Sequence, residues 1–122
     1  MKKKVAILGS TGSIGKSLLK IVQKDKRKFN ILLLTADKNY KIILDQANNF
    51  KVKNIIITND KYYKLAISKN KKKKINIYKN FDNLKKIFPT KIDYVMSSIV
   101  GLDGLIPTFK IIKFTKKIAI AN

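Results

Sequence analysis

The 122-residue chain contains no cysteine and no histidine. Without cysteine it forms no disulfide and offers no thiolate, and without histidine it lacks the commonest metal ligand and general base. Its seven acidic residues are scattered, as Asp45, Asp60, Asp82 and Asp93 illustrate. We therefore predict no catalytic residue and no metal site within this sequence.

Long apolar runs are also missing. No run approaches the ~20 residues that a transmembrane helix needs. The lysines after Met1 precede an apolar run, residues 5–8, that ends at Gly9. This run is too short for the ~7–15-residue core of a secretory signal. The sequence thus predicts a cytoplasmic protein without a membrane partner.

Positive charge is abundant, with 28 lysines and arginines and a net charge of +21. A basic field attracts polyanions, so a non-catalytic nucleic-acid-binding domain is one open alternative. However, Arg27 is the only arginine, and base recognition favours arginine. Lysine, isoleucine and asparagine share codons rich in adenine and thymine. We therefore expect a solvated lysine surface rather than a nucleic-acid site.

Short β-branched runs recur along the chain, separated by segments with helical spacing. The runs are residues 5–8, 31–34, 55–57, 75–77, 92–96 and 118–120. They are almost continuously apolar, which is typical of strands covered on both faces. Their alternation with helices predicts one α/β domain over residues 1–122, with a Rossmann-like, doubly wound, mainly parallel sheet and helices on both faces.

The segments between the runs predict helices through apolar positions at helical spacing. These positions are Ile14, Leu18, Ile21 and Val22; then Ile43, Ala47 and Phe50; then Tyr63, Ala66 and Ile67; then Leu84 and Ile87; and finally Leu105, Phe109 and Ile112. Residues 69–74 are nearly all lysine and predict an exposed turn.

The strongest motif is the glycine loop of residues 9–15, which follows the first strand and opens the first helix. Gly9 permits a tight turn, Gly12 lets the backbone approach a pyrophosphate, and Gly15 allows close packing. The helix N-terminus suits an anion. Hydroxyls of Ser10, Thr11 and Ser13 can cap the helix or donate to phosphate oxygens. The loop predicts a dinucleotide site.

A mononucleotide P-loop fits this sequence poorly. That motif needs a glycine five positions before its terminal glycine and lysine. Gly15 and Lys16 provide the terminal pair, but position 10 is Ser10.

The loop after the second strand bears on cofactor choice. Asp37 lies near the position where an acidic residue takes the ribose 2′-hydroxyl of NAD, and Lys38 beside it suits the 2′-phosphate of NADP. A plain alternative is that Asp37 or Asn39 caps the next helix. The residues alone leave the choice open.

Three segments together resemble the 1-deoxy-D-xylulose 5-phosphate reductoisomerase family, the NADPH-dependent enzymes of the non-mevalonate isoprenoid pathway. They are residues 5–15, residues 34–39, and residues 98–122 with Ser98, Gly101, Gly104 and Pro107. The segments occur in family order and span the chain. By this resemblance, we expect the N-terminal NADPH-binding domain of such an enzyme.

The resemblance also implies roles for single residues. Thr11, Gly12, Ser13 and Ile14 are expected to contact the pyrophosphate and its ribose. Lys38 and Asn39 are expected at the 2′-phosphate, and Asn122 near the nicotinamide. The family usually has glycine where this chain has Asp37, so a carboxylate stands near the expected 2′-phosphate.

For the full-length enzyme the resemblance implies a metal-assisted rearrangement followed by hydride transfer from NADPH. A divalent metal (Mg or Mn), a sugar phosphate substrate and a homodimer belong to that enzyme. Its acidic metal ligands come after a lysine and a glutamate that would follow Asn122, so we expect this chain to be an inactive fragment. A complete, cofactor-binding remnant is the alternative.

Another NAD(P)-dependent reductase or epimerase is a second enzymatic alternative, because extended short-chain reductases share the G-x-x-G-x-x-G spacing. That class needs a Tyr-x-x-x-Lys pair. None of the five tyrosines has a lysine four positions later.

Overall fold

One parallel sheet organises the computed structural model, which describes residues 2–99 and 101–121. The strands are β1 (Lys3–Leu8), β2 (Phe29–Ala36), β3 (Asn54–Ile57), β4 (Asn76–Tyr78), β5 (Ile92–Ser97) and β6 (Thr115–Ile120). Their order is β4-β3-β2-β1-β5-β6, and every pairing is parallel. All six predicted strands are confirmed. Most of their ends differ from the predicted ones, by three residues or fewer.

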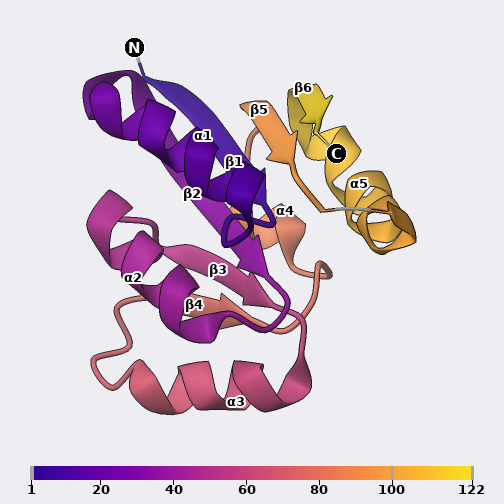
Figure 1. Cartoon of the computed structure of the whole chain (residues 1–122). Coiled ribbons are helices and arrows are strands. Elements are labelled where there is room, and N and C mark those ends of the chain that lie inside the picture. Colours follow the sequence, from indigo (N-terminus) through magenta and orange to yellow (C-terminus); the bar gives the residue numbers. More distant parts are fainter. Residues whose placement is uncertain (1, 100, 122) are drawn as a thin grey trace.

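Helices cover both faces of this sheet, as predicted (Figure 1). They are α1 (Ser13–Lys24), α2 (Tyr40–Phe50), α3 (Asp60–Lys69), α4 (Leu84–Ile87) and α5 (Leu105–Ile111), with short 3-10 turns at Lys26–Lys28, Gly101–Gly104 and Ile112–Phe114. Helices α1, α2 and α3 pack on one face, and α4 and α5 on the other.

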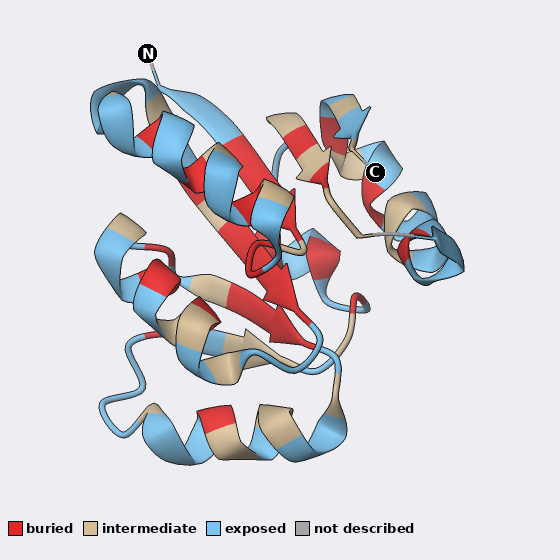
Figure 2. Cartoon of the chain, in the orientation of Figure 1, coloured by how far each residue is buried: buried red, intermediate tan, exposed pale blue. Residues whose placement is uncertain are grey.

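The core consists of two apolar layers separated by the sheet (Figure 2). Along β1, Val5 and Ile7 face the layer under α1 and α2, whereas Ala6 and Leu8 face the layer under α4 and α5. All four are 0% exposed. Because successive side chains of a strand point to opposite faces, burial of both sets makes the strand continuously apolar.

Helix α1 is rotated relative to the predicted core stripe. Leu19 and Val22 are buried, but Ile21, predicted to lie in the core, is 59% exposed. Gly15 lies on the buried face with Leu19 and Val22, at positions i, i+4 and i+7. The close approach of Gly15 to the preceding loop fixes this rotation, which apolar spacing alone did not reveal.

The predicted buried face of α3 is also partly wrong. Ala66 is buried as predicted, whereas Ile67 is 46% exposed. The core positions predicted for α2 and α4 fit better. Ile43 and Ala47 of α2 are buried, and so are Leu84 and Ile87 of the short α4.

The C-terminal elements depart most from the sequence prediction. The predicted stripe of Leu105, Phe109 and Ile112 is wrong: these residues are exposed, and α5 buries Ile111 instead. The strand β6 was predicted to be buried on both faces, yet Ile120 is 59% exposed. Helix α5 is apolar on more than one side, so its spacing does not say which side meets the sheet, and β6 is the edge strand.

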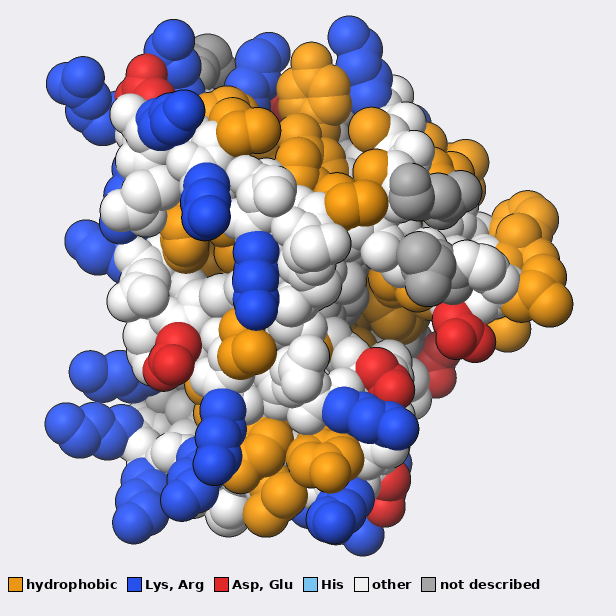
Figure 3. All heavy atoms as spheres, viewed as in Figure 1, with side chains coloured by type: hydrophobic (Ala, Val, Ile, Leu, Met, Phe, Trp, Pro, Cys, Tyr) orange, Lys and Arg blue, Asp and Glu red, His pale blue; other side chains and the backbone are white. Residues whose placement is uncertain are grey.

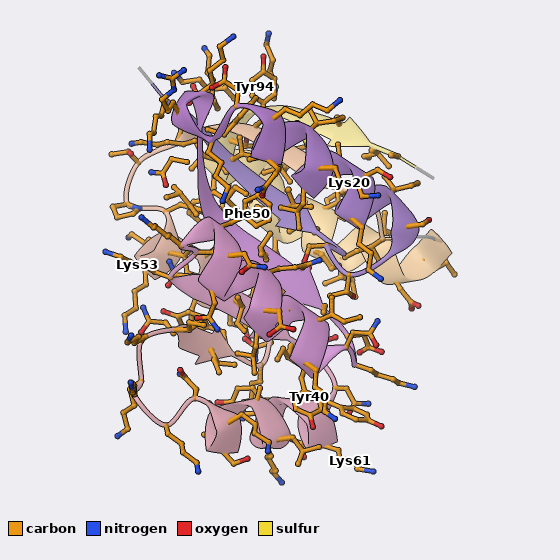
Figure 4. The ribbon with its side chains drawn as sticks, turned by 60° about the vertical axis from the view of Figure 1, so that its left-hand side comes forward. Lys20, Tyr40, Phe50, Lys53, Lys61 and Tyr94 are labelled. Atoms are coloured by element: carbon orange, nitrogen blue, oxygen red, sulfur yellow. The ribbon has the colours of Figure 1, made fainter. Side chains whose placement is uncertain are left out.

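Lysine side chains cover the surface as predicted, and every lysine is exposed. On the face in Figure 3 they are spread among apolar and neutral side chains rather than gathered into one stripe. Figure 4 places Lys20 on α1, Lys53 before β3 and Lys61 on α3, far apart on the periphery. Within the described residues, no helix is long and apolar enough to span a bilayer.

The strand order reverses at β1. The chain runs outward through β2, β3 and β4 and then crosses to β5, which pairs with the other edge of β1. In open α/β sheets, ligands bind beyond the carboxyl ends of the strands at such a switch point. The fold therefore places the loops after β1, β2 and β5 around one crevice.

Asp93 links three strands at the opposite, amino end of the sheet. Its carboxylate accepts from the Lys4 backbone N–H at 2.8 Å and lies 3.7 Å from the Lys116 Nζ. The Lys4 N–H bond, helped by the Lys116 charge, lowers the pKa of the Asp93 carboxyl below its ordinary value. A carboxyl group whose pKa is lowered by folding stabilises the folded state at pH values above its unfolded-state pKa. This contribution disappears as the pH falls through the folded-state pKa.

We expect Asp93→Asn to lower the free energy of unfolding at pH 7 by more than it does at pH 3. Urea unfolding at both pH values measures this difference. Asp60→Asn is the control, since Asp60 forms an exposed ion pair within α3, with Lys64 at 3.1 Å. An equal loss from Asp93→Asn at both pH values would contradict the assigned role.

Candidate functional site

An open cleft of about 480 Å³ lies at the carboxyl edge of the sheet, at the switch point of the strand order. Side chains and backbone from several loops line it: Gly9, Thr11, Gly12, Thr35, Ala36, Asp37, Thr58, Phe81, Ser98, Ile99, Asp103 and Pro107. The glycine loop and the loop after β2, both predicted as site segments, are thus brought together.

Two neighbouring strands fix the start of the glycine loop. The backbone N–H groups of Gly9 and Ser10 donate to the Thr35 carbonyl at 3.1 and 3.0 Å, and the Gly9 N–H also lies 3.0 Å from Thr35 Oγ1. On the other side, the Ser98 hydroxyl donates to the carbonyl oxygens of Leu8 and Gly9 at 3.0 and 2.8 Å. The loop is therefore held on both sides of β1.

Each glycine of the motif has its own structural reason. Gly9 has φ +76°, and a Cβ there would lie 3.0 Å from Ser98 Oγ. A Cβ on Gly15 would lie 2.4 Å from the Gly9 carbonyl oxygen, so Gly15 packs on the loop backbone itself. A Cβ on Gly12 would meet only the Gly9 oxygen, at 3.7 Å. Gly12 thus leaves open space on the cleft side, which a bound group can enter.

The hydroxyls of the loop do not cap α1, because Gly12 is its N-cap and no side chain makes a capping bond there. Ser10 is fully buried: its hydroxyl donates to Gln46 Oε1 at 2.8 Å, and Gln46 Nε2 donates to the Ser10 carbonyl at 3.0 Å. Thr11 accepts from Asn39 Nδ2 at 3.3 Å. Of the two roles predicted for these hydroxyls, helix capping is therefore wrong; Ser10 and Thr11 hold the loop in place.

The start of α1 has a geometry that suits an anion. Ser13 is exposed and Ile14 half-buried in its first turn. The first N–H groups of a helix have no intrahelical partner, and they carry the positive end of the helix dipole. Open space at Gly12 lets an anion approach these donors. The residues present therefore fit a phosphate-bearing ligand.

Asp37, Lys38 and Asn39 are exposed beyond the end of β2. Asn39 is the N-cap residue of α2, but its side chain makes no capping bond, and Asp37 does not cap α2 either. The Asp37 carboxylate accepts from the Thr58 hydroxyl at 2.7 Å. The helix-capping alternative is therefore wrong for both side chains.

Several residues that line the cleft were not among the site residues predicted from the sequence. Thr58 and Ser98 directly follow β3 and β5, so the carboxyl-edge rule offered a signal for both. Phe81, buried in a loop before α4, gave no such signal. Asn122 lies outside the described residues. Across residues 2–99 and 101–121, no three metal-binding side chains gather in one place.

The family model and the curated relatives that this sequence matches all describe the same enzyme. The family model for 1-deoxy-D-xylulose 5-phosphate reductoisomerase matches residues 5–122. The reductoisomerase of Pelagibacter ubique is 54% identical over 122 residues, which cover 98% of this chain and 31% of that protein. The Thermodesulfovibrio yellowstonii enzyme is 38% identical, again over 98% of this chain and 31% of its own.

Solved structures agree with the sequence relatives. The Zymomonas mobilis reductoisomerase in complex with NADPH has a TM-score of 0.88 and 28% identity, and the match covers 100% of this chain and 32% of that one. A reductoisomerase complex with NADPH, fosmidomycin and magnesium has a TM-score of 0.85 and 29% identity, over 98% and 30% of the two chains. The chain spans about a third of the length of the relatives it matches, and it belongs to the 1-deoxy-D-xylulose 5-phosphate reductoisomerase family.

Proposed function

We propose that residues 1–122 form the NADPH-binding domain of a 1-deoxy-D-xylulose 5-phosphate reductoisomerase. The observation that carries this proposal is the open face of Gly12 at the N-terminus of α1, inside the cleft at the switch point of the sheet. Family membership supports this reading over the short-chain reductase and nucleic-acid-binding alternatives.

The pyrophosphate of the cofactor is assigned to the loop of Gly9, Thr11 and Gly12 and to the first-turn N–H groups of Ser13 and Ile14. Ser10 and Gly15 act behind this surface, because both are buried. When bound, NADPH supplies the hydride for the reduction. The described residues of this chain contribute binding and orientation.

The 2′-phosphate is assigned to the loop after β2. Lys38 and Asn39 are exposed there and line a shallow hollow with Tyr40, Lys41 and Tyr62. Two ammonium groups in one hollow provide the positive charge that a phosphate dianion needs. Asn122, expected near the nicotinamide, stays a prediction from the family resemblance.

The complete enzyme would carry out the rearrangement and NADPH-dependent reduction that give 2-C-methyl-D-erythritol 4-phosphate. The remaining two thirds of the relatives' length is where we place the divalent metal ligands (for Mg or Mn), the sugar phosphate site and the further domains. A homodimer and a cytoplasmic location complete the proposal.

Two glycine variants test the cofactor site. We expect the chain to bind NADPH in calorimetric titration, and Gly12→Ala to weaken binding at least about tenfold, equivalent to ~1.4 kcal/mol, since its methyl group enters the open space. Gly12→Ala should keep the wild-type free energy of unfolding. Gly15→Ala is the matched contrast: its Cβ meets the Gly9 carbonyl, so we expect a loss of roughly 2 kcal/mol in stability.

Equal NADPH affinity of the wild-type chain and Gly12→Ala would contradict the assignment. Absence of NADPH binding to the folded wild-type chain would overturn the proposed function itself.

The 122-residue chain is also expected to bind NADPH without oxidising it. The assay follows NADPH absorbance with 1-deoxy-D-xylulose 5-phosphate and Mg²⁺ present, and a full-length reductoisomerase serves as the positive control. The expectation rests on the donor set, because no cluster of metal-binding side chains occurs among the described residues. Turnover by the purified chain would place catalytic groups within it.

A further inference from the structure

The loops after β2 and β3 hold a carboxylate at the mouth of the cleft. Asp37 and Thr58 are the first residues beyond these two strands, and the ladder continues through them: the Thr58 N–H donates to the Ala36 carbonyl at 3.1 Å and the Asn59 N–H to the Asp37 carbonyl at 3.0 Å. The Thr58 hydroxyl donates to Asp37 Oδ1 at 2.7 Å. Asp37 is thus fixed by both its backbone and its side chain.

The charge of this carboxylate is not neutralised by a neighbouring cation. The ion pairs found among the described residues involve Asp25, Asp60, Asp82 and Asp93, but not Asp37. Lys38, adjacent in sequence, lines the shallow hollow beside Tyr40 rather than the cleft that Asp37 lines. The carboxylate residue therefore lines the cleft, whereas the lysine lines the neighbouring hollow.

A carboxylate in this position suits a ribose diol. It accepts hydrogen bonds from hydroxyl groups at the end of the second strand, as acidic residues do in NAD sites. A phosphate dianion in the same place would be repelled, because like charges at close range disfavour each other. The Thr58 proton does not relieve this repulsion, since it is already donated to Asp37.

We propose that Asp37, held by Thr58, is a specificity-determining residue that takes the adenosine ribose hydroxyls, so that this domain binds NADH as well as NADPH. NADH uses the carboxylate of Asp37. NADPH relies on the lysines of the neighbouring hollow, Lys38 and Lys41, at the cost of repulsion from Asp37. The inference rests on the proposed cofactor site and adds the choice of nucleotide to it.

The test is calorimetric titration of the chain with NADPH and with NADH. For the wild-type chain we expect dissociation constants within about tenfold of each other. Asp37→Gly should tighten NADPH about tenfold and weaken NADH about tenfold, because it removes both the repulsion and the acceptor. Asp37→Asn keeps the side-chain size and is expected to shift the ratio in the same direction.

Two further variants separate a specific role from a general one. Thr58→Val keeps the carboxylate but removes its donor, so NADH binding should weaken while NADPH binding changes less. Asp45→Asn removes an exposed negative charge from α2, outside the cleft, and should leave the ratio unchanged. Thermal unfolding of each variant checks that the fold is intact.

A wild-type preference for NADPH above about a hundredfold, or an unchanged ratio in both Asp37 variants, overturns this inference and leaves the NADPH site standing. If the folded wild-type chain binds neither nucleotide, the proposed function and this inference both fall.

Discussion

The burial of β1 is the constraint on which the rest of the structure depends. It pairs with β2 on one edge and β5 on the other, and its residues from Val5 to Leu8 are inaccessible to water on both faces. A strand enclosed on four sides can leave the core only at its end, and there Gly9 turns the chain in a left-handed conformation. The position of the glycine loop follows from this exit.

The loop is positioned by backbone contacts more than by side chains. Thr35 and Ser98 hold Gly9 from the two neighbouring strands, and Gly15 returns to pack on the Gly9 carbonyl. That return also sets the rotation of α1, which explains why Ile21 faces water. Binding geometry and helix packing are therefore two results of the same close backbone approach.

The charges near the cleft differ from the charge of the surface as a whole. The many lysines are exposed and spread over the surface, so their field is general. Within the cleft, the donors proposed for the anion are backbone N–H groups at the start of α1, and the side chain that directly follows β2 is the carboxylate of Asp37. A chain of +21 net charge thus places a carboxylate where its cofactor's ribose is expected, and local geometry, not net charge, decides what that part of the cleft attracts.

The sequence alone determined the strands, the parallel doubly wound fold and two segments that line the cleft, the glycine loop and the loop after β2. Continuous apolar runs report burial on both faces, and the three glycines report a left-handed turn at Gly9, open space at Gly12 and close packing at Gly15. The tertiary structure decided which way individual side chains turn. Ser10 donates to Gln46, and Asp37 accepts from Thr58. The apolar side chains predicted to pack beneath α5 are exposed to solvent. These orientations depend on partners distant in the chain, and local spacing carries no information about them.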